Sequence, residues 1–378
     1  MTPAATRENS QLVDQIKARI SSSNDGVITF YDYMQLSLYH PEYGYYMKES
    51  PKVGKDGDFY TSSYIGTLMG EMLAVAFAEY WGQFPPIREY LVVEWGGGTG
   101  RLAGQILDEL KSAYPLIYEK LRYQIVDTSA YHRGLQLQTG NQHGDQLEIA
   151  SPAEWEKHHQ TLPERTIVIS NELLDAFPVH RFQYKHGSLH EVFIGWDDEQ
   201  ARFGERLIQT EGAYSFVPQL DRIAGRMVEG QQIEFNPHAG EWIAGIARKL
   251  QSGMIITIDY GDLAEKLYTP SRMKGTLMCY FRHQGHDNPY VNIGEQDITA
   301  HVNFTSCIEA GEAAGVSDWK FETQREFLMR HGILNRMQNH TELDPFHPVV
   351  KRNRAIRQLL IGDSMAEVFK VLTQKKGD

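Results

Sequence analysis

Residues 91–100 read LVVEWGGGTG, a short apolar run that passes through one acidic residue into a cluster of glycines. Leucine and isoleucine then recur at helical spacing over residues 102–110, so the stretch predicts a buried strand, a tight loop and a helix. Glycines in such a loop let the backbone approach a ligand closely, and the first amides of the helix are free to bind it. We therefore expect an α/β fold with a ligand at the end of this strand.

The glycine loop is compatible with two nucleotide ligands. Glu94, Gly96, Gly98 and Gly100 have the spacing E-x-G-x-G-x-G, which is typical of the first motif of Rossmann-like S-adenosylmethionine methyltransferases. Residues 98–103, GTGRLA, also satisfy the dinucleotide pattern G-x-G-x-x-A, and a tight turn without a ligand is a third interpretation. The acidic residue so close to the loop favours the methyl donor.

Further apolar runs alternate with helical patterns, which is typical of parallel strands joined by crossover helices. Residues 180–185 and 189–194 flank a turn signal and predict a hairpin inside a long gap between two of these strands. We expect an N-terminal helical cap over residues 1–86 and a sheet domain over 87–378, with an inserted substrate subdomain at about 180–236. The predicted strands after the first are 123–127, 146–149, 166–169, 254–258 and 368–372.

The ends of two predicted strands carry candidate site residues. Asp127 ends the second strand, where a carboxylate can accept hydrogen bonds from ribose hydroxyls, although it could instead cap a helix ahead of Ser129. Asn171, Glu172 and Asp175 follow the fourth strand and are the candidate catalytic residues. If residues 172–175 form a helical turn, both carboxylates lie on one side of it and could hold a guanidinium, while Asn171 and Asp175 could serve as helix caps.

Composition excludes several classes of protein. The 378 residues are 41% hydrophobic and 23% charged, as in a folded globular protein. The net charge is −12 and the chain has no run of basic residues, which argues against a nucleic acid as partner. The negative charge favours a partner that is itself basic. The histidines and the two cysteines lack the spacing of a metal site. Residues 1–20 lack the composition of a leader, and no apolar run could span a membrane, so we expect a cytoplasmic protein.

Several motifs in order along the chain resemble the MidA-type family of S-adenosylmethionine-dependent methyltransferases. The resemblance covers most of the chain. The motifs are residues 39–46 (YHPEYGYY), 57–62 (GDFYTS), 69–71 (MGE), 94–100 (EWGGGTG), 171–179 (NELLDAFPV), 258–261 (IDYG), 275–277 (GTL) and 294–304 (GEQDITAHVNF).

The resemblance implies a seven-stranded class I methyltransferase sheet and additional site residues. Thr61 and Ser62 would border the cofactor, and a substrate cleft would be formed by Asp58, Glu71, Asp259, Tyr260, Gln296 and Asp297. The family's mitochondrial member methylates arginine in a protein, which implies a protein acceptor with an exposed arginine.

This chain departs from the family pattern beside the site. Ser63 and Tyr64 stand where the family usually has Pro and Glu, and Trp95, Gly97 and Thr99 replace other usual residues in the glycine loop. These departures affect the expected methyl acceptor more than the expected fold. A small-molecule O- or N-methyltransferase, or an assembly factor that binds the cofactor without turnover, remains the alternative to a protein-arginine methyltransferase.

Overall fold

A computed structural model describes residues 9–52, 54, 57–58, 66–209, 217–361 and 365–377. The chain divides into two compact units, each assembled from three separate segments. Tyr60–Leu173, Ile243–Tyr260 and Ala310–Asp378 form the parallel-sheet unit. Met1–Phe59, Leu174–Trp242 and Gly261–Glu309 form the antiparallel unit.

The predicted seven-stranded Rossmann-like sheet is confirmed. Its strands run in the order β4, β3, β2, β5, β10, β16, β15, and all are parallel to one another except β16, which is antiparallel to both neighbours. A short strand, β14 (Val302–Asn303), pairs in parallel with the last two residues of β10, Gly261 and Asp262. The seven strands are β2 (Tyr90–Trp95), β3 (Leu121–Val126), β4 (Leu147–Ala150), β5 (Thr166–Asn171), β10 (Gly253–Asp262), β15 (Asp318–Thr323) and β16 (Phe369–Lys376).

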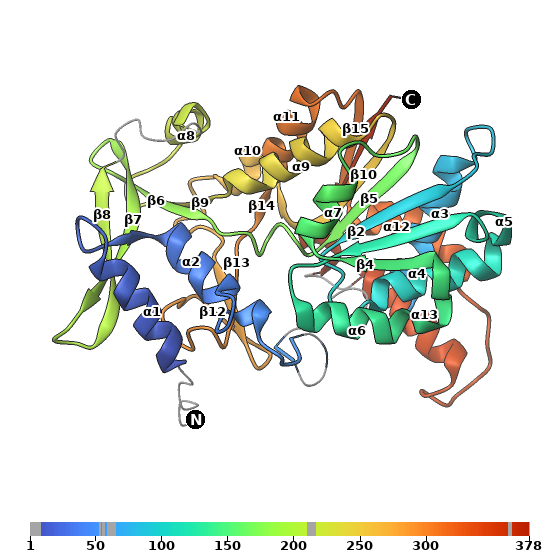
Figure 1. Cartoon of the computed structure of the whole chain (residues 1–378), viewed down its shortest axis with the longest axis horizontal. Helices are drawn as coiled ribbons and strands as arrows, with labels where there is room; N and C mark the ends of the chain where they lie inside the picture. The colour runs from blue at the N-terminus through green and yellow to red at the C-terminus, as the bar shows by residue number, and fades with distance from the viewer. Residues whose placement is uncertain are drawn as a thin grey trace. The chain divides into compact units, whose positions relative to one another are not determined.

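Helices cover both faces of this sheet, which is why its central strands are apolar on both sides. Figure 1 shows α4 and α6 along one side of the sheet and α7 on the other. The helices of the unit are α3 (Leu68–Trp81), α4 (Arg101–Ala113), α5 (Pro115–Tyr118), α6 (Ala130–Gly140), α7 (Pro152–His158), α12 (Gln324–Arg330), α13 (Pro348–Ile361) and α14 (Met365–Val368), with the C-terminal part of α9 (Pro237–Lys249).

Helix α3 packs against α4 in the core of the parallel-sheet unit. Its residues were expected in the N-terminal cap over residues 1–86, but α3 belongs to the parallel-sheet unit. The sequence of α3, LMGEMLAVAFAEYW, is apolar on nearly all sides, and 12 of its 14 residues are buried. Such a helix needs cover around its whole circumference, which the sheet and α4 provide.

The antiparallel unit combines the N-terminal residues with the predicted insertion. Strand β1 (Ile28–Thr29) pairs with β7 (Ser188–Asp197). The predicted hairpin is confirmed, since β7 also pairs with the preceding strand. The first helix of this unit is α1 (Ser10–Ser21). One sheet has the order β1, β7, β6, β9 with β8 beside β7, and a second has the order β12, β11, β13. The remaining strands are β6 (His180–Lys185), β8 (Arg202–Gln209), β9 (Gln232–Phe235), β11 (Met278–Phe281), β12 (Gln284–His286) and β13 (Asp297–Thr299). The remaining helices are α2 (Phe30–Tyr39), α8 (Val217–Ala224), α10 (Ala264–Leu267) and α11 (Phe304–Ala313), the last shared with the other unit.

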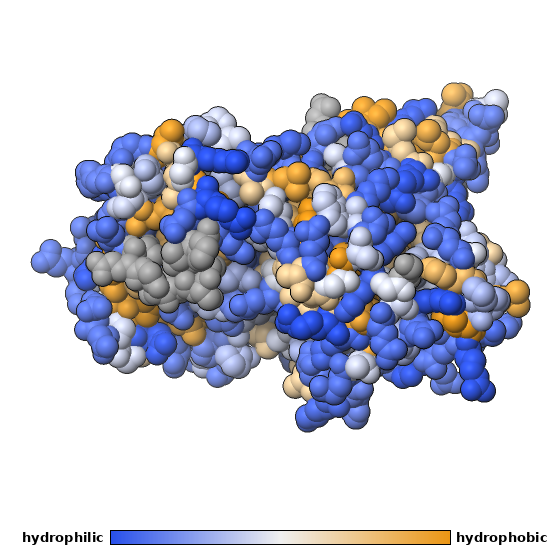
Figure 2. Space-filling model, turned by 90° about the horizontal axis from the view of Figure 1, so that it is seen from above, coloured by the Kyte–Doolittle hydropathy of each residue, from blue (hydrophilic) through white to orange (hydrophobic). Residues whose placement is uncertain are grey.

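Hydrophilic residues cover most of the face shown in Figure 2, with hydrophobic residues in small separate patches. This distribution agrees with the acidic, charged composition. Among the residues described above, no helix is long and apolar enough to cross a bilayer.

Candidate functional site

The glycine loop connects β2 to α4 in the parallel-sheet unit. Gly96, Gly98 and Gly100 all have left-handed backbones, with φ of +72°, +52° and +79°. A Cβ atom on Gly100 would lie 3.0 Å from Gln136 Cα, whereas one on Gly98 would meet nothing within 4 Å. The loop is therefore closed toward α6 and open at Gly98, the position where a ligand can approach the backbone.

Two buried carboxylates flank this loop. Glu94 accepts a hydrogen bond from the Tyr123 hydroxyl at 2.8 Å, and burial, with a smaller contribution from Asp127, raises the pKa of Glu94 to about 7. Asp127 accepts hydrogen bonds from the Ser129 amide and from Gln136 Nε2. Ser129, and not Asp127, caps α6, so the capping alternative for Asp127 is wrong.

Gln136 joins Asp127 to the glycine loop. Its Nε2 donates to the Gly98 carbonyl at 2.9 Å as well as to Asp127. Its Oε1 is buried and has no hydrogen-bond partner among the described residues. Two carboxylates, an available amide oxygen and an open stretch of backbone fit a ligand that carries an ammonium group and hydroxyls, as S-adenosylmethionine does.

The pH dependence of unfolding should differ between the wild-type protein and Glu94→Gln. The pKa of Glu94 is higher in the folded chain than its ordinary 4.5, so the folded protein holds this proton more tightly and loses stability as the pH rises from 4.5 to about 7. The amide of the variant carries no such proton, so the variant should gain up to about 3 kcal/mol relative to wild type over this range. Urea unfolding at pH 5, 6, 7 and 8 measures the difference; parallel pH profiles would contradict it.

Asn171 and Glu172 lie at the carboxyl end of β5, beside the end of β2. Glu172 has a left-handed backbone, with φ of +53°, and its amide donates to the Ile258 carbonyl of β10 at 2.9 Å. Asn171 Nδ2 donates to Glu172 Oε1 at 3.1 Å, while Asn171 Oδ1 is buried without a partner among the described residues. A glutamate rarely adopts this conformation, and such strain is concentrated at functional sites.

The helical turn expected over residues 172–175 is wrong. The left-handed Glu172 ends the strand, and a turn without helix follows it. Helix capping by Asn171 or Asp175 is therefore excluded as well. Asp259 lies beside Glu172: its carboxylate accepts hydrogen bonds from the amides of Leu173 and Tyr260, and the Tyr260 ring packs on Phe369.

The antiparallel unit holds four further predicted residues, Asp58, Asp175, Gln296 and Asp297. Asp58 and Asp297 accept hydrogen bonds from the hydroxyls of Tyr45 and Tyr46, at 2.8 and 2.7 Å. Burial raises the pKa of Tyr46 well above its ordinary value, and Asp297 and Asp175 add to this effect. Burial also raises the pKa of Asp297 to about 7.

Gln296 stands next to this group, and its Nε2 donates to the Asn288 carbonyl. Tyr45 and Tyr46 belong to the motif at residues 39–46 but were not among the predicted site residues. The density of aromatics in residues 39–46 is the signal that could have identified them. Thr61, Ser62, Ser63 and Tyr64 lie outside the described residues.

Glu71, predicted to border the cleft, forms an ion-pair cluster inside the parallel-sheet unit. Arg352 donates to both of its oxygens, at 2.9 and 2.5 Å, and Thr67 donates to one at 2.6 Å. Arg336 lies 3.8 Å from Glu71 and also pairs with Glu109. Burial alone would raise the pKa of Glu71, but the hydrogen bonds from Arg352 and Thr67 hold it below its ordinary value.

Glu71→Gln should lower the free energy of unfolding by about 3 kcal/mol, because it leaves two arginines next to a neutral, largely buried side chain. Glu89→Gln is the matched control, since Glu89 pairs with Arg122 at the surface and both side chains are nearly half exposed. The control should change stability by less than about 1 kcal/mol. Urea unfolding of both variants tests this, and equal losses would contradict a structural role for Glu71.

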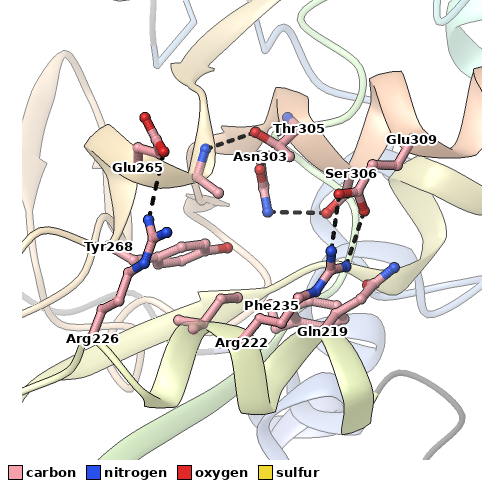
Figure 3. A pocket seen from close by; sticks show the side chains of 12 residues that line it. Gln219, Arg222, Arg226, Phe235, Glu265, Tyr268, Asn303, Thr305, Ser306 and Glu309 are labelled. Atoms are coloured by element: carbon pink, nitrogen blue, oxygen red, sulfur yellow. Dashed lines mark hydrogen bonds and ion pairs between the residues drawn. The ribbon is translucent and has the colours of Figure 1, made fainter.

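A pocket of about 210 Å³ in the antiparallel unit lies between α8, α10 and α11 (Figure 3). Arg222 and Glu309 form a two-point ion pair across it, and Arg226 pairs with Glu265 at 3.7 Å. All four charged side chains that line this pocket thus have partners within it. No net charge is left to attract an ionic ligand.

Comparison with known proteins identifies the family. The family model for S-adenosyl-L-methionine-dependent methyltransferases matches residues 72–321, about two thirds of the chain. The chain belongs to this family. A crystal structure from Burkholderia thailandensis with S-adenosyl-homocysteine bound is 31% identical, covers 97% of this chain and 92% of that one, and superimposes with a TM-score of 0.84.

The curated relatives of this methyltransferase are similar over most of its length. The mouse protein arginine methyltransferase NDUFAF7, mitochondrial, is 26% identical over 89% of this chain and 77% of the mouse protein. The Xenopus tropicalis protein of the same name is 27% identical over 95% of this chain and 84% of its own. The methyltransferase and its cofactor, S-adenosylmethionine, predicted from the glycine loop and the motifs, are confirmed; the dinucleotide alternative is wrong.

The expectation of a cytoplasmic location is wrong. The relatives from mouse, Drosophila melanogaster and human are named as mitochondrial proteins. The expectation relied on the composition of residues 1–20, which describes that segment and not the compartment in which the folded protein acts.

Proposed function

We propose that this methyltransferase transfers a methyl group to a guanidinium nitrogen of an arginine side chain in another protein. The observation that carries the proposal is the strained backbone of Glu172 at the carboxyl end of β5. The ends of parallel strands line the ligand crevice of such a sheet, and a carboxylate there suits a planar cation. The names of the curated relatives and the net charge of −12 support the same acceptor.

We assign the cofactor to the glycine loop. Glu94, Gly96, Gly98, Gly100 and Asp127 hold it, and we retain Thr61 and Ser62 as further candidates. When bound, S-adenosylmethionine supplies a methyl carbon that its positively charged sulfur makes electrophilic. The buried carboxylates face the ammonium and the ribose, and the open backbone at Gly98 admits the cofactor to the loop.

We assign the acceptor to the group that follows β5. Glu172 accepts hydrogen bonds from two guanidinium nitrogens, one of which is the attacking nitrogen, while Asn171 holds the Glu172 carboxylate in place. The attacking nitrogen would form a bond to the methyl carbon as the bond from that carbon to sulfur breaks, which leaves S-adenosylhomocysteine. The nitrogen would lose one proton to the Glu172 carboxylate. We retain Asp175, Asp58, Glu71, Asp259, Tyr260, Gln296 and Asp297 as candidates, although the ion pairs of Glu71 support a structural role instead.

Methyl-labelled S-adenosylmethionine tests the acceptor. The purified protein is incubated with it and an extract of cells that lack the protein, and the products are separated into macromolecules and small molecules. Label recovered as methylarginine after acid hydrolysis of the proteins supports the proposal. Label in methyllysine or in the small-molecule fraction contradicts it, as does cofactor binding without transfer.

A further inference from the structure

A second pocket in the antiparallel unit, of about 240 Å³, is lined mostly by polar and charged groups. The lining comes from residues 45–58, from the turn between β11 and β12, and from residues 294–295. Among the described residues, its charged side chains are three cations and two carboxylates: Lys48, Lys52, Arg282, Asp58 and Glu295. These five side chains carry one net positive charge, in a chain whose net charge is −12.

Both carboxylates of the pocket are already engaged. Glu295 forms an ion pair with Lys48. Asp58 accepts a hydrogen bond from the Tyr45 hydroxyl on one oxygen, at 2.8 Å, and from the Arg282 amide on the other, at 2.6 Å. Two of the three cations, Lys52 and Arg282, take no part in the Lys48–Glu295 ion pair.

Lys52 is one of them, and it is only 3% exposed. Its amine donates a hydrogen bond to the Ser50 hydroxyl and lies 4.8 Å from the centre of the Tyr45 ring. Burial lowers the pKa of Lys52 to about 8, and the neighbouring Lys48 contributes to this shift, while the charges of Asp58, Glu295 and Asp297 oppose it. No carboxylate among the described residues forms an ion pair with this buried amine.

Arg282 is the other, and a strained turn presents it. Arg282 and His283 link β11 to β12 with φ of +50° and +62°, where asparagine and glycine are usual. Asp58 holds both turn residues: its carboxylate accepts the Arg282 amide, and its carbonyl accepts the His283 amide at 3.0 Å. Within the described ranges, the Arg282 guanidinium has no ion-pair partner.

We propose that this pocket binds an oxyanion, a carboxylate or a phosphate group, between the Lys52 amine and the Arg282 guanidinium. Burial of an amine without a carboxylate partner is costly, and an oxyanion removes that cost. Arginine presents a planar pair of donors that matches either group. The shared anchor at Asp58 fixes both cations at one pocket, since the Asp58 amide also donates to the Lys52 carbonyl. The proposal does not require that the methyl acceptor be arginine, although Asp58 is also one of the residues retained as candidates for the acceptor.

Competitive acetylation of the full-length protein at pH 8, read by mass spectrometry, tests the site. The probes are inorganic phosphate and N-acetylaspartate N-methylamide, and the controls are the corresponding asparagine compound and sodium chloride at matched ionic strength. A bound anion that raises the pKa of Lys52 by one unit lowers its neutral fraction from about one half to about one tenth. We therefore expect saturable protection of Lys52 of about fivefold, and none of Lys274, whose side chain is 86% exposed.

Two variants of the turn make the test specific. Arg282→Asn removes the guanidinium but suits the left-handed backbone, and His283→Asn makes the same change at the next position without removing an arginine. Protection should be lost in the first variant and kept in the second. Stronger protection by the aspartate compound indicates an acidic protein side chain, and stronger protection by phosphate indicates a phosphate group.

Equal protection by sodium chloride or by the asparagine compound would overturn the proposal, as would protection that persists in Arg282→Asn. The wild-type measurements decide the question even if that variant fails to fold.

Discussion

Glu172→Gln should lower the rate of methyl transfer by about two orders of magnitude and leave the affinity for S-adenosylmethionine within about twofold of wild type. The amide keeps the size and hydrogen bonds of the side chain but loses the charge that holds the guanidinium and accepts its proton. Single-turnover transfer and isothermal titration measure the two quantities.

Glu164→Gln is the matched control for this prediction. Glu164 is exposed and stands just before the amino end of β5, whereas Glu172 follows its carboxyl end. The control should transfer at the wild-type rate. Unchanged transfer in Glu172→Gln would remove this residue from the acceptor site.

Glu172→Gly provides a second readout of the same residue. Glycine adopts a left-handed backbone without strain, so this variant should keep the stability of the wild-type protein or exceed it. It should nevertheless transfer as slowly as Glu172→Gln. A variant that is both stable and slow would show that the Glu172 side chain serves the reaction and not the fold.

Gly98→Ala should weaken S-adenosylmethionine binding at least tenfold, a loss of about 1.4 kcal/mol or more. The new methyl group would meet no protein atom within 4 Å, so it would occupy the open side of the loop that we assign to the cofactor. The left-handed backbone at this position adds a folding cost of about 1 to 2 kcal/mol.

Gly144→Ala separates these two effects. Gly144 also has a positive φ, +49°, with ψ of −119°, and a Cβ there also meets nothing within 4 Å, but it lies in the segment Asn141–Gln146, outside the glycine loop. Gly144→Ala should lose at least as much stability as Gly98→Ala in thermal unfolding, because its ψ lies outside the left-handed region that other residues adopt. Only Gly98→Ala should lose affinity in isothermal titration; a matching loss in Gly144→Ala would mean that strain alone weakens binding.

The sheet could be predicted from sequence because its strands are buried on both faces. Residues 91–93, 166–169 and 254–258 are short runs that are apolar apart from Thr166 and Thr257, and each lies within an observed strand. The grouping into units could not be predicted in this way. Strand β1 joins the N-terminal residues to the hairpin through the pair Ile28 and Ile194, which are remote in sequence.

The candidate site was predictable where one short segment defines it. The glycine loop is such a segment, because its pattern of glycines marks the left-handed positions directly. The conformation of Glu172 could not be predicted in this way, because the Ile258 carbonyl that binds its amide belongs to a strand far along the chain. Tyr46 was missed for the same reason: its partner, Asp297, is 251 residues away.

The position of β16 between β10 and β15 governs how the chain can fold during synthesis. When β10 has left the ribosome, its outer edge stays bare until more than 100 further residues have been translated, because its partner ends at Lys376. A nascent chain with an unpaired apolar strand is prone to aggregate. Premature stop codons anywhere before β16 should therefore yield products that are captured by chaperones or degraded, and not shortened enzymes.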